Sequence, residues 1–281
     1  SYKYNDCITM VLDKKMLIAG PNSFIAKVFM GQLENKTYIT LSVRGDEWRS
    51  FDYSAIDTII YFAAIVHHPE ITDEALYNKV NAETPYGMAK LAVVQGVKKF
   101  IYISTMAVVG LGPQFGKVNP ITRNTPLRPN TPYGRSKAKG EQMLRGVDGL
   151  YVQLVRLPNV YGKHCPGTFY HRIEQLAKLK FMPVCKFDYK FSLISVENVA
   201  VVLKRLLTID IGGVFCPQDT PILSITERIK QIADANGIQQ RQMKWMWPML
   251  WLANKVLPKK FTDNLYGGYY IDPTEFPVLT D

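Results

Sequence analysis

Short apolar runs alternate with longer segments of helical periodicity through the first 160 residues or so of the chain. The apolar runs, which predict β-strands, lie at 15–20, 37–43, 56–62, 99–104 and 150–156. Apolar positions recur at helical spacing in the intervening segments 23–34, 73–97 and 133–146. Strands that alternate with helices predict an α/β fold with a parallel sheet, whose crossover connections are right-handed.

The pattern loosens after about residue 160, where prolines and aromatic residues become more frequent. Two further helices are expected at 196–208 and 224–237, and Ser224 with Glu227 forms a predicted capping box for the second. We therefore expect one domain over residues 1–160. A smaller C-terminal substrate-binding lobe is expected over residues 161–281, with some segments returning to the first domain.

The stretch MLIAGPNSFIAKVF, residues 16–29, resembles a dinucleotide-binding fingerprint that has lost two of its three glycines. Gly20 can supply the tight turn, and Ser23 and Ala26 are small residues at the other two glycine positions. The stretch follows a predicted strand and opens a predicted helix, whose free N–H groups favour a phosphate. Alone it is equally typical of a plain strand–turn–helix; with the features below it predicts a working, modified cradle in a doubly wound, Rossmann-type domain.

A second feature is the sequence TPYGRSKAKG, which places Tyr133 and Lys137 four residues apart and hence on one helix face. Tyrosine titrates near ~10 in water, and a neighbouring ammonium lowers its pKa, which would make it a better acid or base. Such a pair alone also suits a solvated helix face. Here it follows a strand that ends in Ser104 and Thr105, whose hydroxyls can hydrogen-bond a substrate carbonyl at the mouth of the sheet.

The chain has the fingerprint, the strand-end hydroxyl and the tyrosine–lysine pair in this order. In this it resembles the NAD-dependent epimerase/dehydratase family, the extended short-chain dehydrogenase/reductases that act on nucleotide sugars. The resemblance runs over roughly residues 15–235 and includes GPNSFIA, YFAAIVH, ISTMAVVG, LVRLPNVYG and FSLISVENVA. It implies a dinucleotide cofactor held by Gly20, Asn22, Ser23, Phe24, Ile25, Ala63, Ala64, Asn81, Tyr133, Lys137 and Pro158.

The same resemblance implies a catalytic group formed by Thr105, Tyr133 and Lys137. Ser104 and Asn159 are expected to contact the substrate. Lys190 is the implied partner of the substrate pyrophosphate, displaced by one position from the family pattern.

Three segments, STMAVVG, NVYGKHCPGTF and GVFCPQD, look most like bacterial capsule and O-antigen enzymes. Those enzymes reduce a UDP-linked 4-keto-6-deoxy-N-acetylhexosamine to UDP-N-acetyl-fucosamine or its quinovosamine isomer. Met106 and Ala107 stand where dehydratases of the family carry an acidic pair, and neither can transfer a proton, so dehydration is not expected. A C4-epimerase with tightly bound NAD and a non-catalytic dinucleotide-binding relative remain as alternatives, the second disfavoured by the retained tyrosine and lysine.

The residues after the second predicted strand bear on the choice of cofactor. NAD enzymes commonly place an acid there to bind the ribose 2′-hydroxyl. In this chain Ser42 and Arg44 occupy the strand end, and Asp46 and Glu47 follow closely. We therefore predict NADP(H) rather than NAD(H), with Arg44 at the 2′-phosphate and the two acids as the alternative.

Charge and composition narrow the partners. A net charge of +10 over 281 residues favours an acidic partner, which can be nucleic acid, an anionic lipid or a phosphorylated small molecule. No zinc-finger or RNP-type motif supports nucleic acid, and the family resemblance implies a UDP-sugar. The cysteines Cys7, Cys165, Cys185 and Cys216 lie far apart, which predicts reduced thiols, no metal site and a cytoplasmic location. No apolar run reaches the length of a membrane span.

Residues 241–260, RQMKWMWPMLWLANKVLPKK, form a tryptophan-rich segment between basic ends, with Pro248 near a bend. We expect this segment to pack over the substrate-binding lobe, with peripheral membrane contact as the alternative. The helices predicted at 73–97 and 133–146 are the expected faces of a homodimer.

Overall fold

The computed structural model describes residues 15–33, 38–66, 73–166, 168–184, 189–276 and 279–280. The chain divides into two compact units, and we describe each by itself. Unit 1 comprises Ser1–Val109, Leu127–Leu157 and Val199–Phe215. Unit 2 comprises Gly110–Pro126, Pro158–Asn198 and Cys216–Asp281. Cys7 and Cys185 lie outside the described residues.

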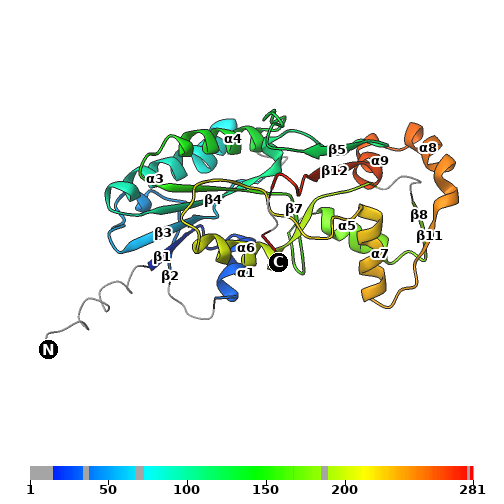
Figure 1. The fold of residues 1–281 in the computed structure, drawn as a ribbon, viewed down its shortest axis with the longest axis horizontal. Coiled ribbons are helices and arrows are strands. Elements are labelled where there is room, and N and C mark those ends of the chain that lie inside the picture. The colour runs from blue at the N-terminus through cyan, green and yellow to red at the C-terminus, as the bar shows by residue number, and fades with distance from the viewer. Residues whose placement is uncertain are drawn as a thin grey trace. The chain divides into compact units, whose positions relative to one another are not determined.

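Unit 1 is built on a parallel sheet of six strands (Figure 1). The strands are β1 (Lys15–Ala19), β2 (Tyr38–Leu41), β3 (Ile56–Tyr61), β4 (Lys99–Thr105), β6 (Tyr151–Leu157) and β10 (Gly213–Phe215). They lie in the order β10-β6-β4-β3-β1-β2, and every neighbouring pair is parallel. The predicted α/β fold and its five strands are confirmed. Sequence reasoning missed β10, a three-residue strand too short to show a pattern.

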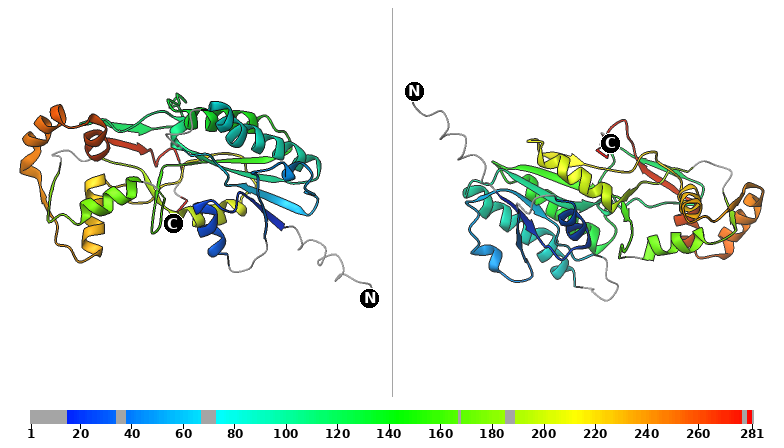
Figure 2. Two further views of the ribbon diagram at one scale, coloured as in Figure 1. Left: turned by 180° about the vertical axis from the view of Figure 1, so that it is seen from behind. Right: turned by 90° about the horizontal axis from the view of Figure 1, so that it is seen from below.

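Helices cover both faces of this sheet. They are α1 (Phe24–Gly31), α2 (Glu74–Asn78), the π-helical turn η2 (Lys79–Glu83), α3 (Thr84–Val94), α4 (Pro132–Arg145) and α6 (Val196–Leu207). Helices α3 and α4 lie on one face and α1 and α6 on the other (Figures 1 and 2). Strands buried on both faces become continuous apolar runs, which is why β3 and β4 are so readily found in the sequence.

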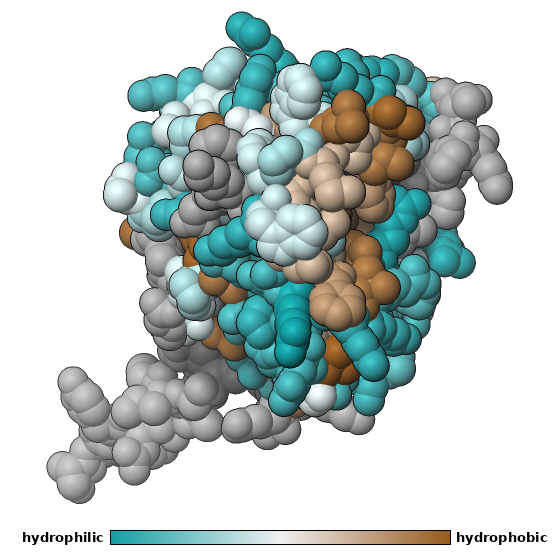
Figure 3. All heavy atoms as spheres, turned by 90° about the vertical axis from the view of Figure 1, so that its right-hand side faces the viewer, coloured by the Kyte–Doolittle hydropathy of each residue, from teal (hydrophilic) through white to brown (hydrophobic). Residues whose placement is uncertain are grey.

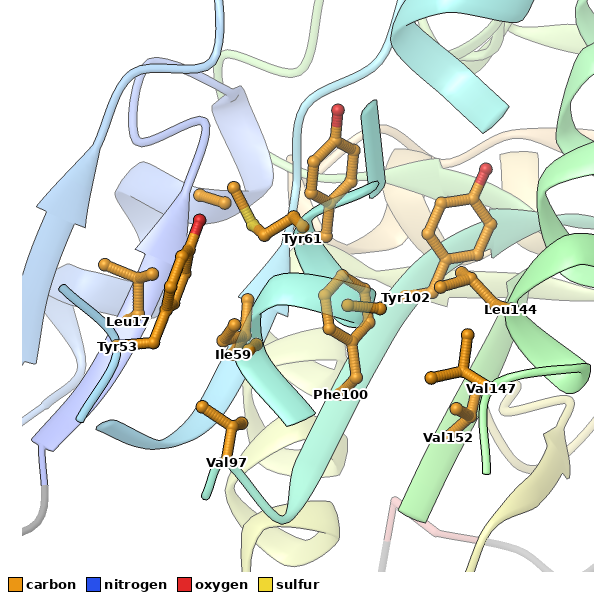
Figure 4. Packing of buried hydrophobic residues seen from close by; sticks show 14 of the residues in the cluster. Leu17, Tyr53, Ile59, Tyr61, Val97, Phe100, Tyr102, Leu144, Val147 and Val152 are labelled. Carbon is orange, nitrogen blue, oxygen red and sulfur yellow. The ribbon is translucent and has the colours of Figure 1, made fainter. Parts of the chain in front are cut away.

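Aromatic and aliphatic side chains together fill the core between the sheet and α3 (Figure 4). The ring of Tyr61 stacks on Phe100 and on Tyr102, with centroids 6.3 and 6.1 Å apart. The two tyrosines keep their hydroxyls satisfied by donating to the backbone of η2, Tyr61 to Val80 O at 2.8 Å and Tyr102 to Asn81 O at 2.5 Å. The core therefore fixes the position of η2.

Among its described residues, unit 2 contains three pairs of short parallel strands and four α-helices. The pairs are β5 (Val118–Ile121) with β12 (Gly268–Ile271), β7 (Asn159–Tyr161) with β9 (Leu193–Ser195), and β8 (Phe181–Pro183) with β11 (Arg241–Met243). The helices are α5 (Thr168–Ala177), α7 (Ile225–Ala235), α8 (Trp247–Val256) and α9 (Lys259–Tyr266). The predicted capping box of α7 is confirmed: Glu227 N donates to Ser224 Oγ, and Ser224 N donates to Glu227 Oε2.

The tryptophan-rich segment differs from its expected packing. It forms a short 3₁₀ turn (Lys244–Met246) followed by α8, and Leu250 is the one buried residue that the structure describes in α8. Most of its large apolar side chains are exposed. Among the described residues, no helix combines the length and apolar character needed to cross a membrane.

Candidate active site

The turn after β1 lies at the point where the chain changes direction across the sheet, because β1 stands between β2 and β3. In doubly wound sheets, ligands bind at the carboxyl ends of the strands at such a point. Gly20 has φ +81°, and a Cβ there would lie 2.7 Å from Ala63 N and Ala63 Cβ. This turn therefore requires glycine for its backbone conformation and for its closeness to the segment after β3.

The start of α1 fits a dinucleotide pyrophosphate. Ser23 is the N-cap residue of α1, and its side chain makes no capping hydrogen bond, so the helix keeps its first N–H groups for a ligand. Asn22 is exposed, and Ser23, Phe24 and Ile25 are half-buried, so the turn is accessible. Small residues replace two glycines of the fingerprint, with Ser23 half-buried at the turn and Ala26 buried in α1.

Asn81 has a position different from the one expected of a cofactor contact. Its side chain is fully buried in the π-helical turn η2. The amide accepts from Ile65 N and donates to Ile65 O, both at 3.1 Å, and donates to Ser136 Oγ at 2.9 Å. Asn81 thus ties the segment after Ala63 and Ala64 to α4, which supports a positioning role in place of direct contact with a cofactor.

Two glycines let α4 approach its neighbours closely. A Cβ on Gly134 would lie 2.6 Å from Ala107 O, and a Cβ on Gly140 would lie 2.4 Å from Asn81 O. Thr131 caps the helix, because its Oγ1 accepts from Gly134 N at 3.0 Å. The cap and the glycines together bring the first turn of α4 against the end of β4.

That approach brings together Tyr133 and Thr105, as the sequence predicts. The Tyr133 hydroxyl is shielded from water, which raises its pKa to about 12, and a hydrogen bond from the Thr105 side chain lowers the pKa in part. The expectation that Lys137 lowers the pKa of Tyr133 was wrong for this structure, because desolvation dominates. The phenol is protonated at neutral pH and can act as a proton donor.

Lys137 lies one turn along α4 and is 1% exposed. Its Nζ donates to Ile103 O at 2.7 Å and lies 4.4 Å from the centroid of the Tyr102 ring. Burial lowers the pKa of Lys137 to about 7, and the nearby Glu141 carboxylate raises it in part. This ammonium is therefore held near its titration point at neutral pH.

Sequence reasoning missed Glu141, a carboxylate 1% exposed beneath the tyrosine and lysine. Arg156 donates to it twice, from Nε at 3.0 Å and from Nη2 at 2.6 Å. Ser104 Oγ donates to Glu141 Oε1 at 2.6 Å, so this hydroxyl faces α4 and not the mouth of the sheet. The arrangement speaks against the substrate contact expected for Ser104. The signal was present in the sequence, since Lys137 and Glu141 are four residues apart on one helix face.

The remaining expected residues are more exposed. Arg44 is exposed after β2 in unit 1, and nearby Asp46 pairs with Arg49 at 3.3 Å. Pro158, Asn159 and Lys190 belong to unit 2, where Pro158 is buried and the other two side chains are exposed. Lys190 Nζ lies 5.7 Å from the centroid of the Tyr270 ring. The structure thus groups Thr105, Tyr133 and Lys137 in unit 1, and the roles of the unit 2 residues stay predictions.

Comparison with known proteins adds to this geometry. The model of the NAD dependent epimerase/dehydratase family matches residues 17–208, more than half of the chain. An N-acetyl-α-D-glucosaminyl-diphospho-ditrans,octacis-undecaprenol 4-epimerase of Escherichia coli O157:H7 is 27% identical over 78% of the chain, which spans 62% of that relative's length. A UDP-glucose 4-epimerase of Vibrio cholerae is 25% identical over 93% of the chain and 88% of its own length.

Solved structures show the same fold. The Bordetella bronchiseptica enzyme WbmG, in complex with NAD and UDP, superposes with a TM-score of 0.66 at 18% identity, covering 95% of this chain and 88% of the other. RMD from Pseudomonas aeruginosa, complexed with NADPH, superposes with a TM-score of 0.63 at 20% identity, covering 82% and 87%.

Proposed function

Because the chain belongs to the NAD dependent epimerase/dehydratase family, we propose that it is an enzyme that reduces the C4 carbonyl of a nucleotide-linked sugar. Its substrate is a UDP-4-keto-6-deoxy-N-acetylhexosamine, and its product is of the UDP-N-acetyl-fucosamine or -quinovosamine type. One observation carries the proposal. Thr105, at the carboxyl end of β4, hydrogen-bonds to the Tyr133 phenol, whose pKa is raised to about 12 by burial. A phenol at this position can donate a proton to a carbonyl oxygen, which is the step that a reduction requires.

Each residue of the group has a role in this reaction. When bound, the nicotinamide cofactor supplies the hydride that adds to C4. Tyr133 donates its phenolic proton to the C4 oxygen, and Thr105 donates a hydrogen bond to the same oxygen and orients the carbonyl. Lys137, one helical turn from Tyr133, stabilises the phenolate left behind and contacts the ribose.

Glu141, paired with Arg156, positions Lys137 by its charge and β4 by its hydrogen bond with Ser104. Neither Glu141 nor Arg156 touches substrate or cofactor in this scheme. Asn159 and Lys190 are the proposed contacts to the sugar and the pyrophosphate. Met106 and Ala107 follow Thr105 directly and cannot transfer protons, which argues against a dehydratase.

We assign NADP(H) as the cofactor on the basis of the residues after β2. Arg44 is exposed there. The backbone N–H of Arg44 donates to Ser42 Oγ at 3.4 Å, so both residues lie in one turn. Asp46, the alternative partner for a ribose hydroxyl, is paired with Arg49. Arg44→Glu should weaken NADPH binding about tenfold or more and leave NADH binding nearly unchanged. Equal loss for both cofactors would contradict the assignment.

A C4-epimerase is the second candidate, favoured by a different observation. Two relatives that align over 78% and 93% of the chain are both named as 4-epimerases, one of a sugar linked through a diphosphate to undecaprenol and one of UDP-glucose. In this alternative the same tyrosine and threonine serve C4, the hydride returns to the same sugar, and NAD stays bound. The sugar carrier is then UDP or a polyprenol.

One assay separates the candidates. Purified protein is mixed with NADPH or NADH and a panel of UDP-4-keto sugars, and the absorbance band of the reduced nicotinamide is followed. Stoichiometric loss of that band with appearance of a 4-hydroxy sugar supports the reductase. Interconversion of UDP-N-acetylglucosamine and its C4 epimer, with NAD retained through purification and no net oxidation, supports the epimerase and overturns the reductase. Cofactor binding without either reaction, on UDP-linked sugars and on an N-acetylglucosamine linked through a diphosphate to undecaprenol, supports a non-catalytic relative and overturns both.

A further inference from the structure

Helix α8 in unit 2 shows its apolar side chains to solvent. Trp245, just before it, is 69% exposed, Met249 is 58%, Leu252 is 61% and Val256 is 82% exposed. A surface helix ordinarily packs its apolar stripe inward and leaves charges outside. Met249, Leu252 and Val256 recur at helical spacing, so they form one continuous face that points away from unit 2.

The exposed surface continues beyond α8. We use the name α8 patch for the exposed apolar residues Trp245, Met249, Trp251, Leu252, Val256, Leu257 and Phe261. Figure 3 looks at the side of the molecule that carries α8 and shows brown, apolar surface gathered there between teal, hydrophilic borders. Scattered single apolar residues need no explanation, but contiguous ones mark an interaction surface.

The border of the α8 patch is basic. Residues 241–262 contain no Asp or Glu, and Arg241, Lys244, Lys255 and Lys259 are exposed. Lys255 Nζ lies 4.1 Å from the centroid of the Trp251 ring, so its hydrocarbon stem and the indole share the surface. Lysines with their stems on apolar surface and their ammonium groups outward are suited to a boundary between oil and water.

We propose that the α8 patch binds the surface of an anionic phospholipid bilayer, with α8 lying in the plane of the interface. Tryptophan favours this boundary because its ring is apolar and its N–H is polar. Basic residues beside an apolar helix face add attraction to anionic headgroups, at a strength that depends on salt. Residues 241–262 carry no acidic side chain, so the border suits a surface of uniformly negative charge, such as a layer of anionic headgroups.

This proposal is independent of the sugar chemistry. It rests on exposure, helical spacing and charge within unit 2, and it holds for a reductase or an epimerase alike. It implies that the enzyme works at the membrane surface, where an acceptor or carrier embedded in lipid is within reach.

The test is flotation of the full chain with vesicles. Phosphatidylcholine vesicles containing phosphatidylglycerol should carry the wild-type protein upward at low salt, and pure phosphatidylcholine vesicles should carry much less. Raising the salt should release the protein, and binding should shift tryptophan emission to shorter wavelength. Absence of flotation with anionic vesicles at low salt overturns the proposal.

Two variants separate the apolar and the electrostatic parts. Met249→Ser/Leu252→Ser/Val256→Ser and Lys244→Glu/Lys255→Glu/Lys259→Glu should each weaken vesicle binding by about tenfold or more. All six side chains are exposed, so both variants should fold and keep wild-type turnover. Circular dichroism and the activity assay check this.

Matched controls change the same residue types in unit 1. Val94→Ser/Ile211→Ser removes exposed apolar side chains, and Lys90→Glu/Lys98→Glu/Lys204→Glu reverses exposed charges. Both controls should bind vesicles like wild type apart from a small effect of net charge. Equal loss in the controls overturns the proposal. A second result would also overturn the proposal: the wild-type protein is a dimer by light scattering, and the triple serine variant is a monomer. The α8 patch would then bind a second copy of the chain.

Discussion

Unit 1 and unit 2 depart from the usual distribution of side chains in opposite ways. Unit 1 buries charge: Lys137 and Glu141 are each 1% exposed, and both are held by named partners. Unit 2 exposes apolar surface, with Trp245 69% and Val256 82% exposed on and beside α8. Buried charge and contiguous exposed apolar surface are the informative exceptions to the burial rule. In unit 1 the buried charges lie beside the proposed catalytic residues. In unit 2 the exposed apolar side chains form the proposed contact surface.

The two exceptions carry different costs. A buried charge lowers the free energy of unfolding unless it is paired and hydrogen-bonded, so its partners cannot be removed without loss of stability. An exposed apolar residue costs little in the folded state, because it is exposed in the unfolded state too. Substitutions in the network of unit 1 should therefore change stability or turnover strongly, and substitutions in the α8 patch should change binding alone.

The largest effect is expected at Tyr133. Tyr133→Phe removes the proton donor but keeps the ring, so turnover should fall by about 10²–10⁴-fold while cofactor affinity changes little. Steady-state kinetics with a 4-keto sugar and fluorescence titration of the cofactor measure the two quantities. The control is Tyr151→Phe, a 43% exposed tyrosine of β6, which should leave turnover unchanged. Wild-type turnover by Tyr133→Phe would show that another group is the acid.

Glu141→Gln should come next. It leaves the buried Lys137 and the largely buried Arg156 without their carboxylate, and breaking a buried ion pair typically costs ~3–5 kcal/mol of unfolding free energy. Urea unfolding measures the loss. The matched control is Glu74→Gln, which breaks the exposed pair with Arg135 and should cost less than ~1 kcal/mol. Equal costs for the two variants would mean that burial does not set the strength of the unit 1 network.

Gly140→Ala tests the close approach of α4. The new methyl would meet Asn81 O at 2.4 Å and the Tyr102 hydroxyl at 2.8 Å, so overpacking should cost about 1–3 kcal/mol. Gly31→Ala meets nothing within 4 Å at the end of α1 and should stabilise by about 0.5 kcal/mol. Thermal unfolding of both variants gives the difference. An unchanged melting temperature for Gly140→Ala would show that α4 can shift away from η2.

Lys137 predicts a pH dependence of stability. Its folded pKa is about 7, below the value of ~10.4 for an unfolded lysine. Between these values the unfolded state binds more protons, so the free energy of unfolding should rise with pH, on the order of 1 kcal/mol per pH unit from pH 8 to 9.5. Lys137→Met should remove this rise. Urea unfolding at each pH gives the free energy of unfolding for wild type and variant. If the two curves of this free energy against pH are parallel, Lys137 has the same pKa in the folded and the unfolded state, and the prediction is wrong.

The local part of this picture was readable from the sequence. Apolar runs gave the strands of unit 1, because they are buried on both faces, and the spacing of Tyr133 and Lys137 on one helix follows from helical geometry alone. The turn at Gly20 was readable because a glycine between a predicted strand and a predicted helix permits a positive φ, and Gly20 has φ +81°.

What escaped prediction depends on contacts between distant segments. The burial that raises the pKa of Tyr133 comes from the packed protein around it, and a sequence shows a neighbouring lysine but not the absence of water. Ser104 looked like a mouth residue because strand ends face ligands, yet Glu141, 37 positions along the chain, accepts its hydroxyl. Asn81 likewise is bound by Ile65 and Ser136. The exposure of the apolar face of α8 also escaped prediction. The same spacing of apolar residues is found in helices that pack this face against the protein and in helices that expose it to solvent.

The last comparison separates the two faces of α8 itself, and its Leu252 variant should show the smallest effect of all. Leu250 is 9% exposed and Leu252 is 61% exposed, so the same substitution can be made two residues apart. Leu250→Ala should cost about 2–3 kcal/mol of unfolding free energy, because it empties a packed site. Leu252→Ala should change it by less than ~0.5 kcal/mol, because its side chain contacts solvent in both states. Urea unfolding without lipid measures both. An equal loss of unfolding free energy in both variants would mean that the outer face of α8 is covered in solution. Unit 2 would then have no open apolar surface to set against the buried charges of unit 1.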